Sequence, residues 1–64
     1  MTAMETLVVT VRETLENMLG ERFTSLPEND RINIQITMIY DLAKRDKNIM
    51  GIIGADIYEK LRKA

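Results

Sequence analysis

Few side chains in this sequence can carry acid–base or nucleophilic chemistry. It contains no histidine and no cysteine, so the usual zinc and iron ligands and the commonest nucleophile–base pairs are missing. Glu13 and Glu16 stand three residues apart and could hold a cation together with the carboxylates of a second chain, as in helical-bundle metal sites. Such sites also need an inward-facing helix surface and usually histidine. We therefore predict no catalytic residues, no metal, no cofactor and no enzymatic activity.

Residues 46–57 partly resemble the calcium loop of EF-hand proteins. Asp46, Asn48 and Gly51 match positions one, three and six of that loop. Met50 and Ile57 occupy the positions of an oxygen ligand and of the bidentate glutamate. Without those oxygens we expect no calcium binding.

The segment Ile49–Ile57 also resembles the I-x-G-x-x-G-x-x-I signature of KH domains. In that family the turn between the glycines clamps a nucleic-acid backbone. The resemblance implies a role for Gly51 and Gly54 in RNA binding. Apolar Ile52 and Ile53 stand between the glycines, where that family has basic or small residues.

The composition indicates one small domain with an aliphatic core. The chain has 64 residues, of which 45% are hydrophobic, with one Phe, two Tyr and no Trp. A domain this short has a marginal core and usually relies on disulfides, a metal or oligomerisation. Because cysteine and histidine are absent, oligomerisation is the compensation that we expect.

The charge is small overall but unevenly distributed along the chain. The net charge is −1, which provides no general attraction to nucleic acid or to membranes. Residues 1–30 carry two basic and six acidic side chains, whereas residues 31–64 carry seven basic and four acidic ones. No apolar run approaches the ~20 residues of a membrane span, and no secretory leader is recognisable. We predict a cytoplasmic protein without membrane contacts.

A first helix is predicted over about residues 3–20. Apolar side chains recur at steps of three and four and form one stripe; they are Met4, Leu7, Val8, Val11, Leu15, Met18 and Leu19. Gly20 follows at the position that commonly ends a helix.

A second helix is predicted over about residues 26–45. Ser25 and Glu28 fit a capping box, in which both side chains bind backbone N–H groups at the helix start. Pro27 suits a first helical turn, and Glu28 and Asp30 favour the positive end of the helix dipole.

The segment Arg31–Tyr40 within this helix also has the features of a strand. Isoleucine and threonine favour strands, and apolar residues alternate with polar ones from Ile32 to Met38. As a helix, the segment is apolar around most of its circumference, which is typical of a buried helix. Two other helices of so short a chain could hardly cover it. We therefore predict a homodimer. Its interface, or alternatively the contact with a partner protein, is expected at Ile32, Ile34, Ile36, Met38, Ile39 and Ile52.

A third helix is predicted over about residues 49–62. Ile53, Ile57 and Leu61 share one face of it. Gly51 and Gly54 cost a helix ~1 kcal/mol each relative to alanine. They indicate either close contact between helices or a helix that begins only after Gly54.

The alternative with a strand at residues 31–37 resembles the ribbon-helix-helix family of DNA-binding regulators. In that family a ribbon formed across a dimer contacts base edges in the major groove. The resemblance implies base contacts by Arg31, Asn33 and Gln35, with Lys44, Arg45 and Lys47 on phosphates. Against it, a long helical sequence and a capping box precede the ribbon.

The fold class expected is thus all-α, a three-helix domain in a homodimer. By elimination, the function most compatible with the sequence is a non-enzymatic protein–protein interaction module, a small regulator or adaptor. A DNA-binding regulator of the ribbon-helix-helix type is the alternative.

Overall fold

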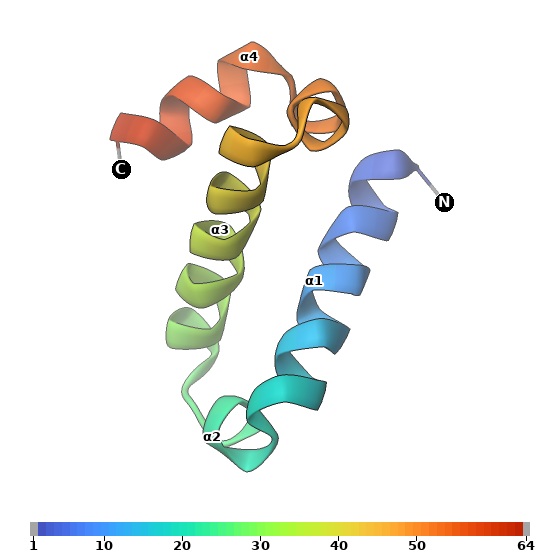
Figure 1. Ribbon diagram of the computed structural model, residues 1–64. Helices are drawn as coiled ribbons and strands as arrows, with labels where there is room; N and C mark the ends of the chain where they lie inside the picture. Colours follow the sequence, from blue (N-terminus) through green and yellow to red (C-terminus); the bar gives the residue numbers. More distant parts are fainter. Residues whose placement is uncertain (1, 64) are drawn as a thin grey trace.

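The computed structural model describes residues 2–63 and contains only helices within that range. The elements are α1 (Ala3–Leu19), α2 (Glu21–Thr24), α3 (Glu28–Arg45) and α4 (Lys47–Lys63). The all-α prediction is confirmed, with one short helix, α2, that the sequence analysis did not predict. Figure 1 shows α1 and α3 side by side, joined by α2 at one end and crossed by α4 at the other.

Helix α1 begins with a capping box that the sequence analysis did not identify. The hydroxyl of Thr2 accepts a hydrogen bond from the backbone N–H of Glu5, and the Glu5 carboxylate accepts one from the N–H of Thr2. The spacing Thr-x-x-Glu is visible in the sequence. At the other end, Gly20 has φ +56° and donates its N–H to the carbonyl of Glu16. The predicted boundaries of 3–20 are therefore correct to within one residue.

The predicted capping box at Ser25 and Glu28 is wrong. Gly20 turns the chain into α2, and the Ser25 hydroxyl donates to the carbonyl of Glu21 at the end of that helix. Pro27 takes the N-cap position of α3, and no side chain caps this helix. Helix α3 consequently begins at Glu28, two residues after the predicted start.

The strand alternative at residues 31–37 is also wrong, because the whole segment lies inside α3. Within the helix, the Thr37 hydroxyl donates a hydrogen bond to the carbonyl of Asn33 at 2.8 Å. Ile39 and Ala43, one turn apart, are buried against the other helices. This helix-period burial outweighs the strand preference of the isoleucines, since propensity is weaker than tertiary packing.

Helix α4 starts at Lys47 rather than at residue 49 and ends at Lys63 rather than at residue 62. The Asp46 carboxylate accepts a hydrogen bond from the N–H of Asn48 at 2.8 Å, which supports the earlier start. Gly54 has φ +82° and ψ 158°, so it divides α4 into two helical halves at a kink. Gly51 stays helical.

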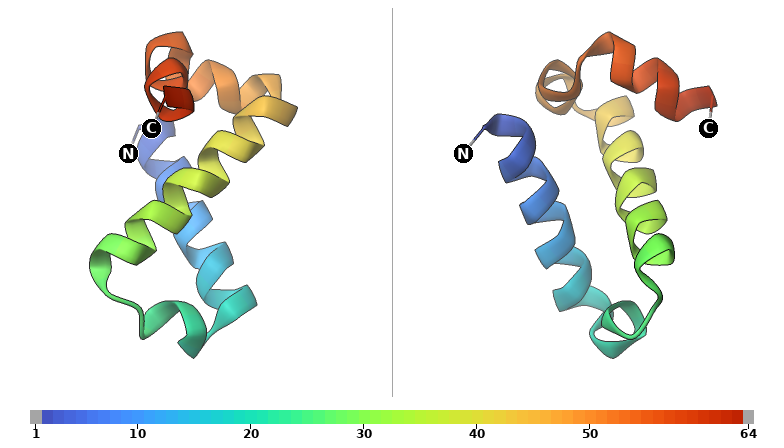
Figure 2. Two further views of the ribbon diagram at one scale, coloured as in Figure 1. Left: turned by 90° about the vertical axis from the view of Figure 1, so that its left-hand side faces the viewer. Right: turned by 180° about the vertical axis from the view of Figure 1, so that it is seen from behind.

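Neither glycine of α4 marks a close helix–helix contact. A Cβ atom added at Gly51 or Gly54 would meet no atom within 4 Å. The predicted close contact is therefore wrong, and so is a helix that begins only after Gly54, because α4 starts at Lys47. The kink at Gly54 sends the second half of α4 away from α1 and alongside the last turns of α3 (Figure 2).

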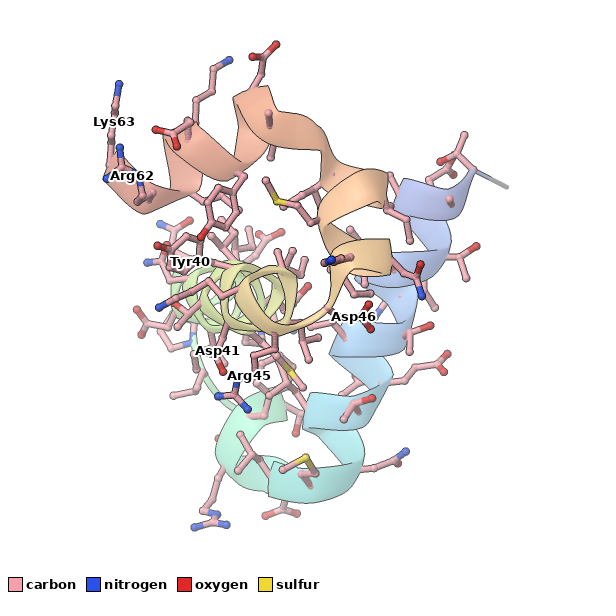
Figure 3. All side chains as sticks on the ribbon, turned by 45° about the horizontal axis from the view of Figure 1, so that its top comes forward. Tyr40, Asp41, Arg45, Asp46, Arg62 and Lys63 are labelled. Carbon is pink, nitrogen blue, oxygen red and sulfur yellow. The ribbon has the colours of Figure 1, made fainter. Side chains whose placement is uncertain are left out.

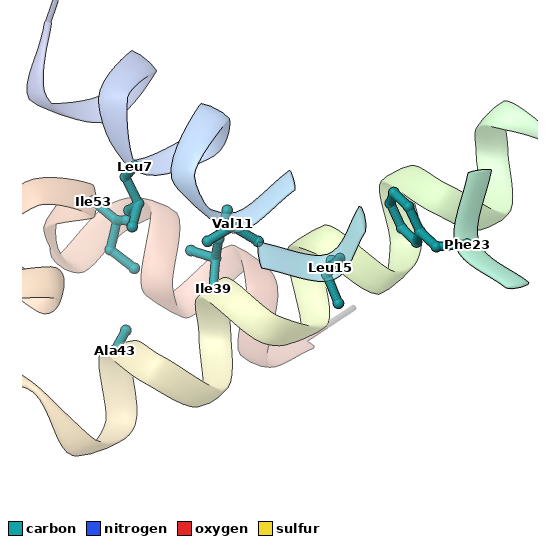
Figure 4. Close-up of a cluster of buried hydrophobic side chains, with 7 residues drawn as sticks. All are labelled: Leu7, Val11, Leu15, Phe23, Ile39, Ala43 and Ile53. Carbon is teal, nitrogen blue, oxygen red and sulfur yellow. The ribbon is translucent and has the colours of Figure 1, made fainter. Parts of the chain in front are cut away.

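The core lies where α1, α3 and the first half of α4 meet, and α2 closes its other end. Its buried side chains are Leu7, Val11, Leu15, Phe23, Ile39, Ala43 and Ile53 (Figure 4). Phe23 is the most deeply buried, with 1% of its surface exposed. Met4, Met38 and Met50 pack around this cluster. The core is thus aliphatic apart from one ring, as the composition indicated.

Candidate interaction surface

An open groove of about 670 Å³ lies between the end of α1 and one side of α3. We call it the methionine groove. Its apolar lining comes from Leu15 and Met18 of α1 and from Ile34 and Met38 of α3. Polar residues along α3 complete it: Asn33, Thr37, Tyr40, Asp41 and Lys44. An apolar floor with a polar rim is typical of surfaces that bind apolar side chains of a partner.

A second hollow, of about 350 Å³, lies between α3 and the second half of α4. We call it the isoleucine notch. Ile36 and Tyr40 of α3 face Leu61 and Arg62 of α4 across it. The notch shares Asn33, Thr37 and Tyr40 with the methionine groove. The two hollows therefore lie next to each other on α3.

Two stacked tyrosines hold the second half of α4 against α3. The rings of Tyr40 and Tyr58 lie 5.1 Å apart at 25°, and the Lys44 ammonium lies 5.1 Å from the centre of the Tyr40 ring. Desolvation of Tyr58 between the helices, followed by its hydrogen bond and charge interaction with Tyr40, raises the Tyr58 pKa above its usual value of 10.0. The neutral form of Tyr58 is thus favoured in the folded protein.

Two exposed ion pairs flank these hollows. Arg45 and Asp41 are 2.6 Å apart on α3, and Arg62 and Glu59 are 2.8 Å apart on α4. Hydrogen bonding and charge from Glu59 raise the pKa of Arg62. Figure 3 shows Tyr40 near Arg62 and places Asp41 next to Arg45. Exposed pairs of this kind add little to stability, so their main effect is to orient the charged groups around the hollows.

The six predicted interface residues separate into three groups. Ile39 belongs to the core, while Ile34 and Met38 are partly buried against it and line the methionine groove. Ile32, Ile36 and Ile52 are exposed, with 43%, 37% and 36% of their surfaces accessible. The structure thus brings Ile34 and Met38 together on one side of α3 and leaves Ile52 apart on α4. An interface at these residues stays a prediction.

Two exposed apolar residues were not among the predicted interface residues. Met18 is 67% exposed at the end of α1, and Ile57 is 41% exposed on α4. Both belong to the apolar stripes of the predicted helices. Periodicity shows which side of a helix is apolar, but it does not show where the neighbouring helix ends.

The residues of the DNA-binding alternative do not share a face. In a helix, Arg31 and Gln35 lie on one side and Asn33 on the opposite one; Arg31 and Gln35 line a small hollow with Arg12 and Phe23. The Nε of Arg31 is buried and has no hydrogen-bond partner among residues 2–63. The base-contacting ribbon implied by the family resemblance is therefore wrong.

The three basic residues assigned to phosphate contacts are all exposed. Lys44 lies over the Tyr40 ring and Arg45 is paired with Asp41. Lys47 begins α4 on the far side of the turn at Asp46.

The described residues do not assemble a cluster of three or more acidic side chains able to hold a metal ion. Glu13 and Glu16 are both exposed on α1. Among residues 2–63, no helix combines the length and hydropathy needed to cross a bilayer.

Comparisons with known proteins identify no relatives of this chain. No protein-family model matches it, and neither a curated protein nor a solved structure does.

Proposed function

We propose that this protein is a small, non-enzymatic interaction module that acts as a homodimer and binds another protein through the surface of α3. One observation carries the proposal: large apolar side chains stay exposed around two adjoining hollows on α3. Met18 borders the methionine groove and Ile36 borders the isoleucine notch, and Ile32 is exposed one turn before Ile36 on the same helix. Contiguous exposed apolar surface on a small protein is typical of a protein-binding site.

The chemistry of the two hollows supports binding rather than catalysis. Their polar groups are one amide, two hydroxyls, one lysine, one arginine and one aspartate. Asp41, the only carboxylate among them, is paired with Arg45. A general base or nucleophile needs a neighbour that activates it, and neither hollow offers such a pair among its lining residues.

The methionine groove is the proposed site for the partner protein. Met18 and Met38 supply flexible thioether side chains, which adapt to differently shaped apolar partners. Asn33 and Thr37 on the rim could pair with polar groups at the edge of the partner. We include in this proposal the cytoplasmic location predicted from the sequence.

The test is affinity capture from a native extract with the tagged protein, with and without nuclease, read by mass spectrometry and nucleic-acid staining. The variant Met18→Glu places a charge in the groove, and the matched control Asn17→Glu places the same charge on the exposed neighbour outside it. We expect a protein that the wild type and Asn17→Glu retain in both arms and that Met18→Glu loses. Partners that disappear with nuclease, or that bind Met18→Glu equally well, would contradict the proposal.

A further inference from the structure

The isoleucine notch continues into a row of side chains along α3. Glu28, Ile32, Ile36, Tyr40 and Lys44 follow one another at intervals of four residues, so they form a single ridge on the helix. The second half of α4 packs through Tyr58 and Leu61 on the part of this ridge near Tyr40. Ile32 and Ile36 lie beyond it and stay exposed. The ridge therefore has an acidic end, an apolar centre and a basic end.

We propose that a second copy of this chain covers the ridge, around a two-fold axis that passes close to Ile36. This inference rests on the homodimer of the proposed function and specifies its face. Antiparallel packing of two α3 helices places Ile36 against Ile36 of the second copy and Ile32 near Tyr40 of that copy. Ridges built on four-residue steps pack into one another at about −50° in helix pairs.

The single chain has more accessible surface than a compact monomer of its mass, as expected if a second copy covers part of it. Its accessible surface is 4787 Å² for a mass of 7.4 kDa, whereas a compact monomer of that mass has about 4200 Å². The excess of about 600 Å² is roughly three quarters of the ~800 Å² that each partner contributes to a standard interface. The Cα radius of gyration, 11.9 Å, also exceeds the ~10.7 Å expected for a chain of this length.

The charges on the ridge favour a second copy over an unrelated partner. In a two-fold arrangement the acidic end of one ridge meets the basic end of the other. Glu28 of each chain then lies on the same side as Lys44 and Arg62 of the second copy. Complementary rim charges of this kind set the orientation of an interface.

The test compares two isoleucines of equal exposure. Ile36 is 37% exposed on the ridge, and Ile52 is 36% exposed on α4 outside it. Sedimentation equilibrium would give the dimer dissociation constant of the wild type, Ile36→Glu and Ile52→Glu, with circular dichroism to check folding. We expect Ile36→Glu to weaken the dimer by at least about 30-fold, the effect of losing one central contact of an interface. Ile52→Glu should leave it within about threefold of the wild type.

Cysteine variants test the axis without disturbing the fold. The chain has no native cysteine, and a disulfide forms only between Cα atoms about 4.4–6.8 Å apart. Under mild oxidation Ile36→Cys should form a covalent dimer, and Ile52→Cys should not. A wild type that stays monomeric at tens of micromolar would overturn both this face and the dimer of the proposed function. A dimer that splits with Ile52→Glu and survives Ile36→Glu, or that crosslinks only through Ile52→Cys, would overturn this face alone.

Discussion

Replacing Gly54 by alanine tests the kink that divides α4. Gly54 has φ +82° and ψ 158°, a conformation that is essentially restricted to glycine, and other residues pay of order 1–3 kcal/mol to adopt it. A Cβ atom there meets nothing within 4 Å, so the cost comes from backbone strain and not from a clash. The protein could avoid the strain by straightening α4, but the Tyr40–Tyr58 stack, worth about 0.5–1.5 kcal/mol, would then separate. As long as the kink is kept, Gly54→Ala should lower the free energy of unfolding by about 1–3 kcal/mol.

Gly51→Ala is the matched control for this change. Gly51 lies three residues earlier in the same helix, has helical backbone angles and equally open surroundings. Alanine there should stabilise the helix by about 1 kcal/mol. In a domain of this size, 1 kcal/mol shifts the Tm by roughly 4–8 °C. Gly51→Ala should therefore melt about 4–8 °C above the wild type and Gly54→Ala at least as far below it.

Thermal unfolding followed by circular dichroism at 222 nm measures both variants. All samples need the same protein concentration, because self-association makes the Tm concentration-dependent. An increase in Tm for both variants would show that α4 is a continuous helix in solution. The kinked packing of Tyr58 against α3 would then be refuted as well.

Two further predictions concern the core and the tyrosine stack. Phe23→Ala should lower the free energy of unfolding by about 3–5 kcal/mol, which is close to the whole stability of a domain this small. We therefore expect this variant to lose the cooperative unfolding transition. The control variant Arg22→Ala, which changes an exposed neighbour, should have the Tm of the wild type. A cooperative Phe23→Ala variant with an unchanged Tm would refute the role of α2 in closing the core. Because the pKa of Tyr58 is raised in the folded protein, the unfolded chain loses the Tyr58 proton first as the pH rises through 10. The neutral Tyr58 hydroxyl therefore stabilises the fold fully below that pH, and this stabilisation is lost as the pH rises above it. Urea unfolding at pH 8 and pH 10.5 should show a larger loss of stability in the wild type than in Tyr58→Phe, and equal losses would contradict this assignment.

Helix periodicity alone was enough to predict most of the secondary structure. The apolar stripe from Met4 to Leu19 predicts α1 to within one residue, because burial repeats with the helical period wherever a helix packs on a core. The absence of histidine and cysteine narrowed the function classes without any structure. The capping box at Thr2 and Glu5 was also readable from its spacing, although it was overlooked.

Local signals failed where two interpretations were compatible with the same residues. Ser25 has the type and spacing of a helix start, yet its hydroxyl bonds backward to Glu21 because Gly20 has already begun α2. The isoleucines of residues 31–37 fit a strand as well as a helix. The burial of Ile39 and Ala43 by α1 and α4 favours the helix. Contacts distant in sequence supplied the energy that distinguished these alternatives.

The sequence by itself favoured an all-helical chain with an aliphatic core, although a strand at residues 31–37 stayed open. It also contained too few reactive groups for the usual enzyme sites, and it predicted more apolar surface than three short helices can bury. Only the tertiary structure decided which apolar residues stay exposed. Met18 and Ile36 belong to the same kind of stripe as Leu15 and Ile39, but Leu15 and Ile39 are buried whereas Met18 and Ile36 stay exposed. Which of these residues are buried depends on where each helix ends and on the kink at Gly54, because both set the position of the neighbouring helices. Sequence periodicity describes one helix at a time, whereas exposure depends on the relative lengths and angles of all of them.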